Sequence, residues 1–293
     1  MENKIEEFCE YLLRERMFSS NTVMAYHNDL KEFSFYLEKH HEDYLVLTKE
    51  NIRDYLKYLS DNHFTSKSIA RHLSSLRSFY NFLVQNKVLL KNIFLEIHNP
   101  KLGRPLPNIL NQEEREQLLS FPNLETAWDK ERYLILELLY STGLRVSELS
   151  NIKLNDIKRK EKTIYTVGKG KKERIVYFGD VALSALNDYL DVRDNLLKKE
   201  QHDYVFVNQK GGKLSRASIE KIVQKRAFEA NLMQHVSPHT LRHTYATDML
   251  SNGADIRTVQ ELLGHEKLST TEIYTHLSSS YLKEEYRHKM MRK

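Results

Sequence analysis

Apolar residues recur at spacings of three and four through the first hundred positions, and this period predicts α-helices. We expect four helices, near residues 2–16, 20–39, 49–61 and 66–86. The last helix carries one apolar stripe, made of Ile69, Leu73, Leu76, Tyr80 and Leu83. Residues 1–98 are therefore expected to form a helical domain with its own core.

A proline-rich stretch, residues 99–108, holds three of the five prolines and predicts an extended linker. Beyond it, residues 109–293 are expected to form a second domain. Gly168 and Gly170 favour a hairpin turn there. Three runs are typical of strands: Thr163–Val167, Glu173–Phe178 and Tyr204–Val207. The predicted fold is mainly α, an N-terminal helical domain followed by an α+β domain with a small antiparallel sheet.

Residues suited to chemistry on a phosphodiester gather in the second domain. The transition state of such a reaction gains negative charge, which fixed cations and hydrogen-bond donors stabilise. Arginine is suited to this because its planar fork binds phosphate through two nitrogens and keeps its proton. The candidate active-site residues are Arg145, Lys169, His239, Arg242, His265 and Tyr274.

Local signals predict where several of these residues lie. Ser237-Pro238 is typical of a helix start, so His239 and Arg242 are expected near the first turn of a helix. Gly143 predicts a break before Arg145, and Gly264 a helix end before His265. A capping box over residues 269–272 places Tyr274 in a short helix.

Each candidate also has an ordinary alternative. Arg145 could form a surface ion pair, Lys169 could lie in a solvated turn, and Tyr274 could be one more half-buried tyrosine. His239 and His243 could be a zinc pair, but the residue after His239 is threonine rather than the glutamate of a zinc protease helix. The order and context of all six residues carry the prediction, rather than any single one.

Four stretches resemble the signature of the tyrosine recombinase (integrase) family, in the family's order. They are Thr-Gly-Leu-Arg-Val-Ser-Glu-Leu at 142–149, Gly-Lys-Gly-x-Lys-x-Arg at 168–174, Ser-Pro-His-x-Leu-Arg-His at 237–243, and Leu-Leu-Gly-His with Ser-Thr-Thr-x-x-Tyr-Thr-His at 262–276. The N-terminal pattern from Ser20 to Phe33 also fits the family. Within it, the chain most resembles the Xer-type recombinases.

The resemblance implies a role for each candidate. Tyr274 matches the nucleophile, and Arg145, Lys169, His239, Arg242 and His265 match the activating set. Glu148 matches the acid that supports the first arginine. The implied reaction is DNA strand cleavage and religation through a 3′-phosphotyrosyl intermediate and a Holliday junction, with no cofactor, metal or ATP.

Charge and composition agree with a partner that is double-stranded DNA. Residues 1–100 hold 13 Lys and Arg against 14 Asp and Glu, and the remainder hold 32 against 26. The basic excess therefore lies with the predicted chemistry. Further DNA-binding candidates are three residues of the fourth expected helix and two of the linker: Lys67, Arg71, Arg77, Lys101 and Arg104.

The resemblance further implies a SAM-like core-binding domain and a catalytic domain that close on DNA as a C-shaped clamp. Four protomers, identical or of two kinds, would act together, and residues 277–293 would dock on a neighbouring protomer rather than on their own domain. A septal, FtsK-like DNA translocase could activate them. The expected role is resolution of chromosome or plasmid dimers at a dif-like site during segregation.

Three rival functions remain at this point. The same chemistry could serve a mobile-element integrase or transposase, a type IB topoisomerase would relax DNA without strand exchange, and an inactive relative would only bind DNA. The single cysteine, Cys9, excludes an internal disulfide and fits a reducing cytoplasm. The sequence has no apolar run long enough to predict a membrane span, so a cytoplasmic, nucleoid-associated protein is expected.

Overall fold

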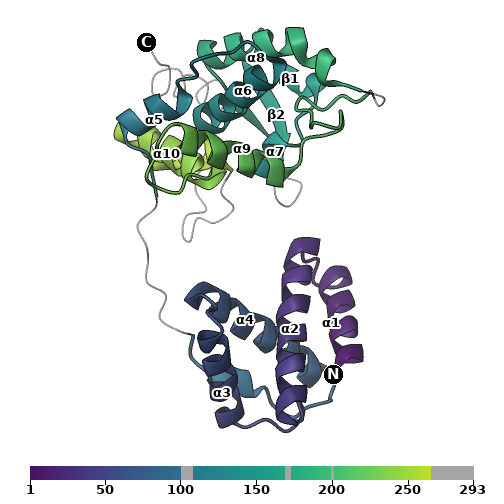
Figure 1. Ribbon diagram of the computed structural model, residues 1–293. Coiled ribbons are helices and arrows are strands. Elements are labelled where there is room, and N and C mark those ends of the chain that lie inside the picture. The colour runs from purple at the N-terminus through teal and green to yellow at the C-terminus, as the bar shows by residue number, and fades with distance from the viewer. Residues whose placement is uncertain (100–107, 169–172, 199–200, 265–293) are drawn as a thin grey trace. The chain divides into compact units, whose positions relative to one another are not determined.

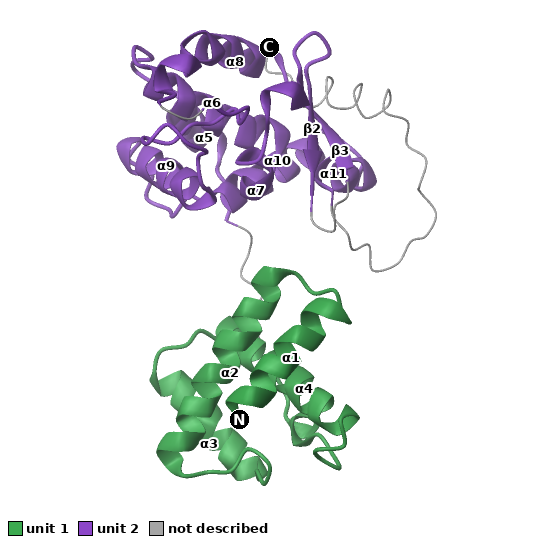
Figure 2. Cartoon of the chain, turned by 90° about the vertical axis from the view of Figure 1, so that its right-hand side faces the viewer, with its two compact units in different colours: residues 1–105 green, residues 106–293 purple. Residues whose placement is uncertain are grey.

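The chain folds into two compact units, residues 1–105 and 106–293, shown in separate colours in Figure 2. The computed structural model describes residues 1–99, 108–168, 173–198 and 201–264. Figure 1 shows unit 1 as a group of helices and unit 2 as helices around a small sheet. Each unit has a hydrophobic core of its own.

Unit 1 contains the four helices predicted from the apolar spacing, which are confirmed within two residues at each end. Serine or threonine begins three of them, because the side-chain oxygens of Ser19, Thr48 and Thr65 accept a backbone N–H of the first turn. The elements are α1 (Glu2–Arg14), α2 (Ser20–His40), α3 (Lys49–Asp61), α4 (Ser66–Gln85) and the 3-10 helix η1 (Ile93–Glu96).

Aromatic side chains dominate the core of unit 1. Phe33 meets Tyr55 edge-on with ring centroids 4.7 Å apart, and Tyr80 packs on Phe94 at 4.5 Å. Such pairs are favourable beyond the area that they bury. Leu73, Leu76, Tyr80 and Leu83 of the predicted stripe are buried, and Ile69 is half-buried. Cys9 is buried, and burial raises the pKa of its thiol to about 11.

A polar network lies inside this core. The Tyr55 hydroxyl is 3.0 Å from His72 Nδ1, and His72 Nε2 is 3.1 Å from Asp29 Oδ1. Arg71 donates to the same Asp29 oxygen at 2.5 Å. Burial lowers the pKa of His72 to about 4, with a smaller contribution from the charge of Arg71. Burial also raises the pKa of Asp29 to about 6, although Arg71 opposes that shift.

Unit 2 is larger and mostly helical in the part that the structure describes. Its elements are α5 (Gln112–Leu119), α6 (Ala127–Thr142), α7 (Val146–Leu149), η2 (Leu154–Asp156), β1 (Ile157–Lys158), β2 (Thr163–Val167), β3 (Glu173–Tyr177), α8 (Asp180–Arg193), η4 (Asp194–Leu196), α9 (Arg216–Glu229), α10 (Pro238–Ser251) and α11 (Ile256–Leu263).

The sheet of unit 2 has the order β1-β2-β3, and both pairings are antiparallel. The predicted strand pair is confirmed, with Thr163 opposite Tyr177 and Val167 opposite Glu173. The hairpin tip at residues 169–172 lies outside the described residues.

The prediction of a strand at Tyr204–Val207 is wrong. Tyr204 and Val207 each form only an isolated bridge, to Lys153 and Lys213. Val205, Phe206 and Val207 are buried at 0–1% exposure within the core of unit 2. A short apolar run of this kind is ambiguous because core burial alone, without a ladder partner, gives the same sequence pattern.

Helix α6 is the centre of unit 2, since ten of its residues are buried and α8, α9 and α10 pack on it. It ends at Gly143, which has a φ of +61° in the left-handed region. A Cβ at this position would lie 2.6 Å from Tyr245 Cδ1 and 2.8 Å from Leu263 Cδ2. Glycine is therefore required both by conformation and by the close approach of α10 and α11.

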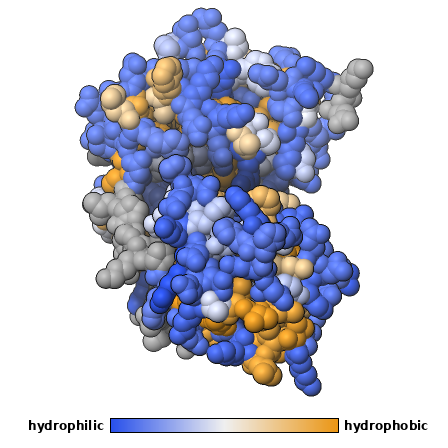
Figure 3. Space-filling view, turned by 60° about the horizontal axis from the view of Figure 1, so that its bottom comes forward, coloured by the Kyte–Doolittle hydropathy of each residue, from blue (hydrophilic) through white to orange (hydrophobic). Residues whose placement is uncertain are grey.

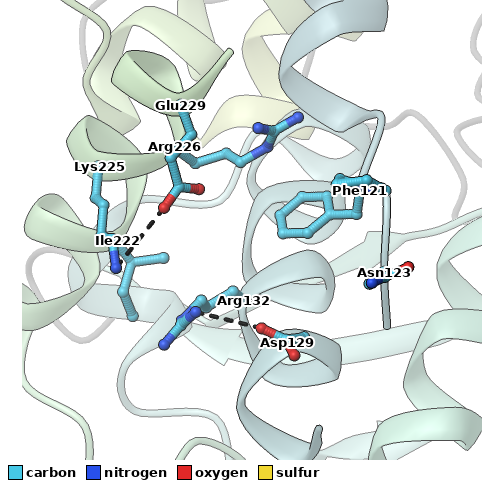
Figure 4. Close-up of a pocket in the computed structure, with 9 residues that line it drawn as sticks. Phe121, Asn123, Asp129, Arg132, Ile222, Lys225, Arg226 and Glu229 are labelled. Atoms are coloured by element: carbon cyan, nitrogen blue, oxygen red, sulfur yellow. Dashed lines mark hydrogen bonds and ion pairs between the residues drawn. The ribbon is translucent and has the colours of Figure 1, made fainter. Parts of the chain in front are cut away.

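A buried arginine completes the packing of α5 against α9. Arg226 donates to the carbonyl oxygens of Leu118 at 3.0 Å and Gln117 at 2.7 Å, and also to that of Ser120. These carbonyls end α5 and have no partner within the helix. The guanidinium carbon of Arg226 lies 4.7 Å from the ring centre of Phe121. Figure 4 shows this arrangement beside a cavity of about 380 Å³.

The face of the molecule in Figure 3 is mostly hydrophilic, with local hydrophobic areas. Exposed large apolar side chains of unit 1 include Met17, Met24, Phe35 and Leu90, and those of unit 2 include Phe228 and Met233. None of the helices within the described ranges is long and apolar enough to cross a membrane.

Candidate active site

Arg145 stands at the start of α7, as the sequence predicts. Its backbone N–H donates to Glu148 Oε2 at 2.8 Å, and its Nη1 donates to Glu148 Oε1 at 2.7 Å. A single carboxylate therefore fixes both the main chain and the side chain of Arg145. The side chain is 26% exposed, which leaves part of the guanidinium open to an approaching anion.

Arg242 lies in α10, whose start is also confirmed. Ser237 is the N-cap and accepts from the Thr240 N–H at 3.3 Å, and Pro238 occupies the first turn. Arg242 is 7% exposed. Its Nη1 donates to the Gly143 carbonyl, and its Nη2 to the Leu263 carbonyl at 2.6 Å. The guanidinium thus joins the end of α6 to the end of α11.

Burial, followed by the positive charges of Arg145 and Arg174, lowers the pKa of Arg242 to about 9. The guanidinium stays protonated at neutral pH, but its charge is incompletely balanced. A bound phosphate would supply the missing negative charge in a place with few competing water molecules.

Glu148 is the buried carboxylate of the cluster, with 1% of its side chain exposed. Burial alone would raise its pKa. The charge of Arg174 and the hydrogen bonds from Arg145 and Arg174 outweigh burial, so the pKa of Glu148 lies below its ordinary value. One carboxylate therefore faces three guanidiniums, and the cluster keeps an excess of positive charge.

The end of α11 accepts hydrogen bonds from all three arginines. Leu262, Leu263 and Gly264 are consecutive, and their carbonyl oxygens accept from Arg174, Arg242 and Arg145 respectively. The last carbonyls of a helix have no partner within it and carry the negative end of the helix dipole. Gly264 is the left-handed C-cap that the sequence predicts, with φ of +63°.

Among the other predicted site residues, His239 lies in the first turn of α10 with an exposed side chain. The structure therefore brings Arg145, Glu148 and Arg242 together and places His239 on the helix that carries Arg242. Lys169, His265 and Tyr274 lie outside the described residues. Among the described residues, no three His, Cys, Asp or Glu side chains are grouped to hold a metal ion.

Arg174 belongs to this cluster, although the sequence analysis did not select it. It is the second residue of β3, and it donates to Glu148 Oε2 at 2.7 Å and to the Leu262 carbonyl. The signal that could have identified it is the last position of the Gly-Lys-Gly-x-Lys-x-Arg stretch. A charged residue that follows a lysine-rich stretch is otherwise typical of solvent exposure.

The predicted DNA-binding residues of α4 differ in their surroundings. Lys67 is exposed, and Arg71 is 43% exposed while it pairs with Asp29. Arg77 donates to the carbonyls of Phe94 and Ile97 and to Asn99 Oδ1, which ties α4 to the end of η1. Ser75, on the same helix, is fully buried. Lys101 and Arg104 lie outside the described residues.

The cavity lined by residues 121–123, α6 and α9 (Figure 4) is separate from the arginine cluster within unit 2. In the picture, Arg132 points toward Asp129 and Lys225 toward Glu229, at 3.3 and 3.7 Å. None of the nine residues that line it is a predicted site residue. Two of its cations pair with acidic neighbours, Arg226 binds carbonyl oxygens, and none of the lining residues belongs to the arginine cluster.

Comparison with known proteins agrees with this geometry. Residues 108–280 match the phage integrase family, and residues 5–87 match the phage integrase N-terminal SAM-like domain. The chain is 41% identical to tyrosine recombinase XerD of Staphylococcus saprophyticus, over 98% of each protein. It is 42% identical to tyrosine recombinase XerC of Oceanobacillus iheyensis, over 98% of this chain and 95% of that one.

The fold also matches those of solved recombinase structures. The XerH recombinase bound to a difH substrate before cleavage is 26% identical, with a TM-score of 0.71 over 96% of this chain and 82% of that one. A λ integrase bound to a core site shares the fold at 17% identity, with a TM-score of 0.72 over 94% of this chain and 99% of that one.

The chain therefore belongs to the phage integrase family, as a tyrosine recombinase of the Xer type. It is a DNA-binding enzyme that cleaves and rejoins DNA strands in site-specific recombination.

Proposed function

We propose that this enzyme resolves chromosome or plasmid dimers at a dif-like site during segregation. The similarity that supports this role is to XerC and XerD proteins over 98% of the chain, together with the likeness to XerH on a difH substrate. The observation that carries the chemistry is the cluster of Arg145, Glu148 and Arg242, which has an excess of positive charge and a partly open guanidinium.

In the proposed cleavage step, the Tyr274 oxygen attacks the scissile phosphorus and the bond from phosphorus to the 5′-oxygen breaks. Arg145 and Arg242 hold the non-bridging oxygens, and His265 donates a hydrogen bond to the phosphate. His239 assists the transfer of the Tyr274 proton, and Lys169 protonates the leaving 5′-oxygen. A 3′-phosphotyrosyl bond and a free 5′-hydroxyl result.

Strand joining reverses these transfers with a different hydroxyl. The 5′-hydroxyl of a partner strand attacks the phosphotyrosine, and Tyr274 leaves and regains its proton. The phosphodiester energy is retained in the protein–DNA bond, so no ATP or metal is required. Two pairs of exchanges pass through a Holliday junction, which requires four protomers on two duplexes.

The remaining parts of the chain receive roles in assembly. Residues 1–98 bind the duplex, through Lys67 and Arg71 among others, and the linker residues Lys101 and Arg104 contact phosphates. The two domains close on DNA as a clamp, and residues 277–293 dock on a neighbouring protomer. A septal DNA translocase activates the tetramer, which acts on the nucleoid in the cytoplasm.

Covalent trapping on genomic DNA tests this role. The protein is incubated with nicked fragments of its host chromosome in EDTA without ATP, and protein–DNA adducts are isolated under denaturing conditions and sequenced. We expect one chromosomal site in the region where replication ends, and no adduct with Tyr274→Phe, which should still bind DNA.

Other outcomes identify the rivals. Adducts at the ends of a mobile element would establish an integrase or transposase role instead. Adducts spread over many sequences, with relaxation of supercoiled plasmid and no strand exchange, would indicate a topoisomerase. Adducts that persist in Tyr274→Phe would show that another residue is the nucleophile.

A further inference from the structure

Arg174 is the less exposed of the two charged residues of β3. Its side chain is 12% exposed, and it crosses from the strand to two other elements. Nη2 donates to Glu148 Oε2 in α7 at 2.7 Å, and Nη1 donates to the Leu262 carbonyl at the end of α11. One side chain thus links three elements that are separate in the sequence.

The Glu148 carboxylate is held from two directions. Arg145 binds Oε1 through its side chain and Oε2 through its backbone N–H, and Arg174 binds Oε2. Without Arg174, the buried carboxylate would lose one of two guanidinium partners. A buried charge with an incomplete set of partners rearranges or takes up a proton. Either response would release Arg145 from its fixed position.

The stem of Arg174 also lies close to Gly264, the C-cap of α11. A Cβ on Gly264 would lie 3.0 Å from Arg174 Cδ. The guanidinium therefore supports the Leu262 carbonyl while the aliphatic stem packs on the Gly264 backbone. The neighbouring carbonyls of Leu263 and Gly264 bind Arg242 and Arg145. The position of the α11 end and the positions of both phosphate-binding arginines are therefore set together.

We propose that Arg174 is a positioning residue for DNA cleavage, which acts through Glu148 and the end of α11 to fix Arg145 and Arg242. The proposal rests on the phosphate-binding roles given to those two arginines above. Arg174 is assigned no direct contact with the phosphate; its terminal nitrogens bind Glu148 and the Leu262 carbonyl. Its Nε is buried and unpartnered, so the fork is held by its two ends.

The chemistry requires arginine at this position. A lysine would keep the charge but present a single ammonium, which cannot bind a carboxylate and a carbonyl in the fixed geometry of a guanidinium fork. Glutamine would remove the charge and keep one donor. Arg159 offers a matched control, since it is an exposed arginine of unit 2 whose contact is a 3.5 Å hydrogen bond to Asn187.

The test compares Arg174→Gln, Arg174→Lys and Arg159→Gln with the unchanged enzyme on a nicked duplex that carries the site mapped by trapping. Removal of a positioning contact should lower the single-turnover cleavage rate by about 10²-fold, near the loss for one donor to the phosphate. DNA affinity should change by less than about 3-fold, because affinity for DNA comes mainly from contacts to phosphates and Arg174 is assigned none. Arg174→Lys should recover part of the rate, and Arg159→Gln should match the unchanged enzyme.

A pH profile separates positioning from a general loss of fold. In Arg174→Gln the Glu148 carboxylate loses a cation, so its pKa rises. Cleavage by this variant should then increase with pH over a range in which the unchanged enzyme and Arg159→Gln are flat. A cleavage rate equal to that of the unchanged enzyme, or a uniform loss with no change of profile, would overturn the proposal.

A double-mutant cycle tests whether Arg174 acts through Glu148. If Arg174 acts through Glu148, Arg174→Gln should cost much less in a Glu148→Gln background, and fully additive losses would overturn that route. Tyr274→Phe is measured in parallel. If the unchanged enzyme yields no Tyr274-dependent adduct, the proposed function fails by itself. The coupling of positions 174 and 148 is then decided by urea unfolding midpoints, where additive shifts would overturn the positioning role.

Discussion

Arg145 and Arg242 donate to neighbouring carbonyl groups, Gly264 and Leu263, each at 2.6 Å. Two residues 97 positions apart in the sequence therefore share the end of one helix. The other terminal nitrogen binds Glu148 in Arg145 and the Gly143 carbonyl in Arg242. Each terminal nitrogen carries a second N–H that can still donate. The end of α11 therefore sets the spacing of the two arginines.

The first prediction concerns Arg242→Lys. Lysine keeps the charge, but a single ammonium cannot bridge the Gly143 and Leu263 carbonyls as the fork does. We expect a loss of about 10²–10³-fold in the single-turnover cleavage rate, the range for one transition-state donor. The measurement is the rate of covalent adduct formation on a nicked duplex. Arg159→Lys serves as the control, and equal rates for both variants would show that charge alone suffices.

The second prediction concerns Gly143→Ala. The added Cβ would meet Tyr245 and Leu263 below 3 Å, at a φ of +61° that L side chains rarely adopt. Overpacking of this kind costs about 1–3 kcal/mol in the free energy of unfolding. The shift of the urea unfolding midpoint measures this loss of stability. Gly212→Ala is the matched control, because its Cβ would meet Asn208 at an ordinary 3.4 Å. Equal midpoints would show that α10 and α11 can move away at no cost.

The fold followed closely from the sequence where the signals were local. The four N-terminal helices follow the spacing of their apolar residues, and serine or threonine caps three of them. Gly143, Ser237-Pro238 and Gly264 each predicted a helix boundary that the structure contains. The segment Tyr204–Val207 was misassigned because Val205, Phe206 and Val207 lie in the core of unit 2, and burial there favours the same apolar composition as a strand.

The candidate site was predictable only in part. Motif order identified Arg145, Glu148 and Arg242, but nothing local predicts that three arginines meet at Leu262, Leu263 and Gly264. Arg174 escaped selection because its partners are 26 and 88 residues distant. Likewise, Arg77 and Arg71 looked like free cations on a helix face, whereas their partners come from η1 and α2.

The third prediction is a pH dependence at Glu148. Because the folded-state pKa is depressed, ionised Glu148 adds stability that is present above the unfolded value near 4.5 and is lost as pH falls through the lower folded value. Removal of one partner of a buried pair costs about 3–5 kcal/mol. Glu148→Gln should therefore destabilise strongly at pH 7, and the difference from the unchanged enzyme should shrink below pH 4.5. A difference that stays constant with pH would contradict the assignment.

The fourth prediction separates structure from DNA binding in α4. Arg77 satisfies two backbone carbonyls at the end of η1, so Arg77→Ala should lower the thermal unfolding midpoint. Lys67 is exposed, so Lys67→Ala should leave the midpoint unchanged. Lys67→Ala should instead weaken DNA binding uniformly and reduce the slope of log affinity against log salt by about 1. A lower midpoint in Lys67→Ala, with weaker DNA binding in Arg77→Ala alone, would exchange the two roles.

The last prediction concerns His72, which lies between Tyr55 and Asp29 in the core of unit 1. Burial, with a smaller effect of Arg71, lowers its pKa to about 4, so the folded state favours the neutral ring. Neutral His72 adds stability that is present above the unfolded value near 6.5 and is lost as pH falls toward 4. An NMR titration of the full chain, with the signal assigned from its absence in His72→Gln, should give a pKa well below 5. A midpoint near 6.5 would show that water or Asp29 stabilises the charged ring inside the core.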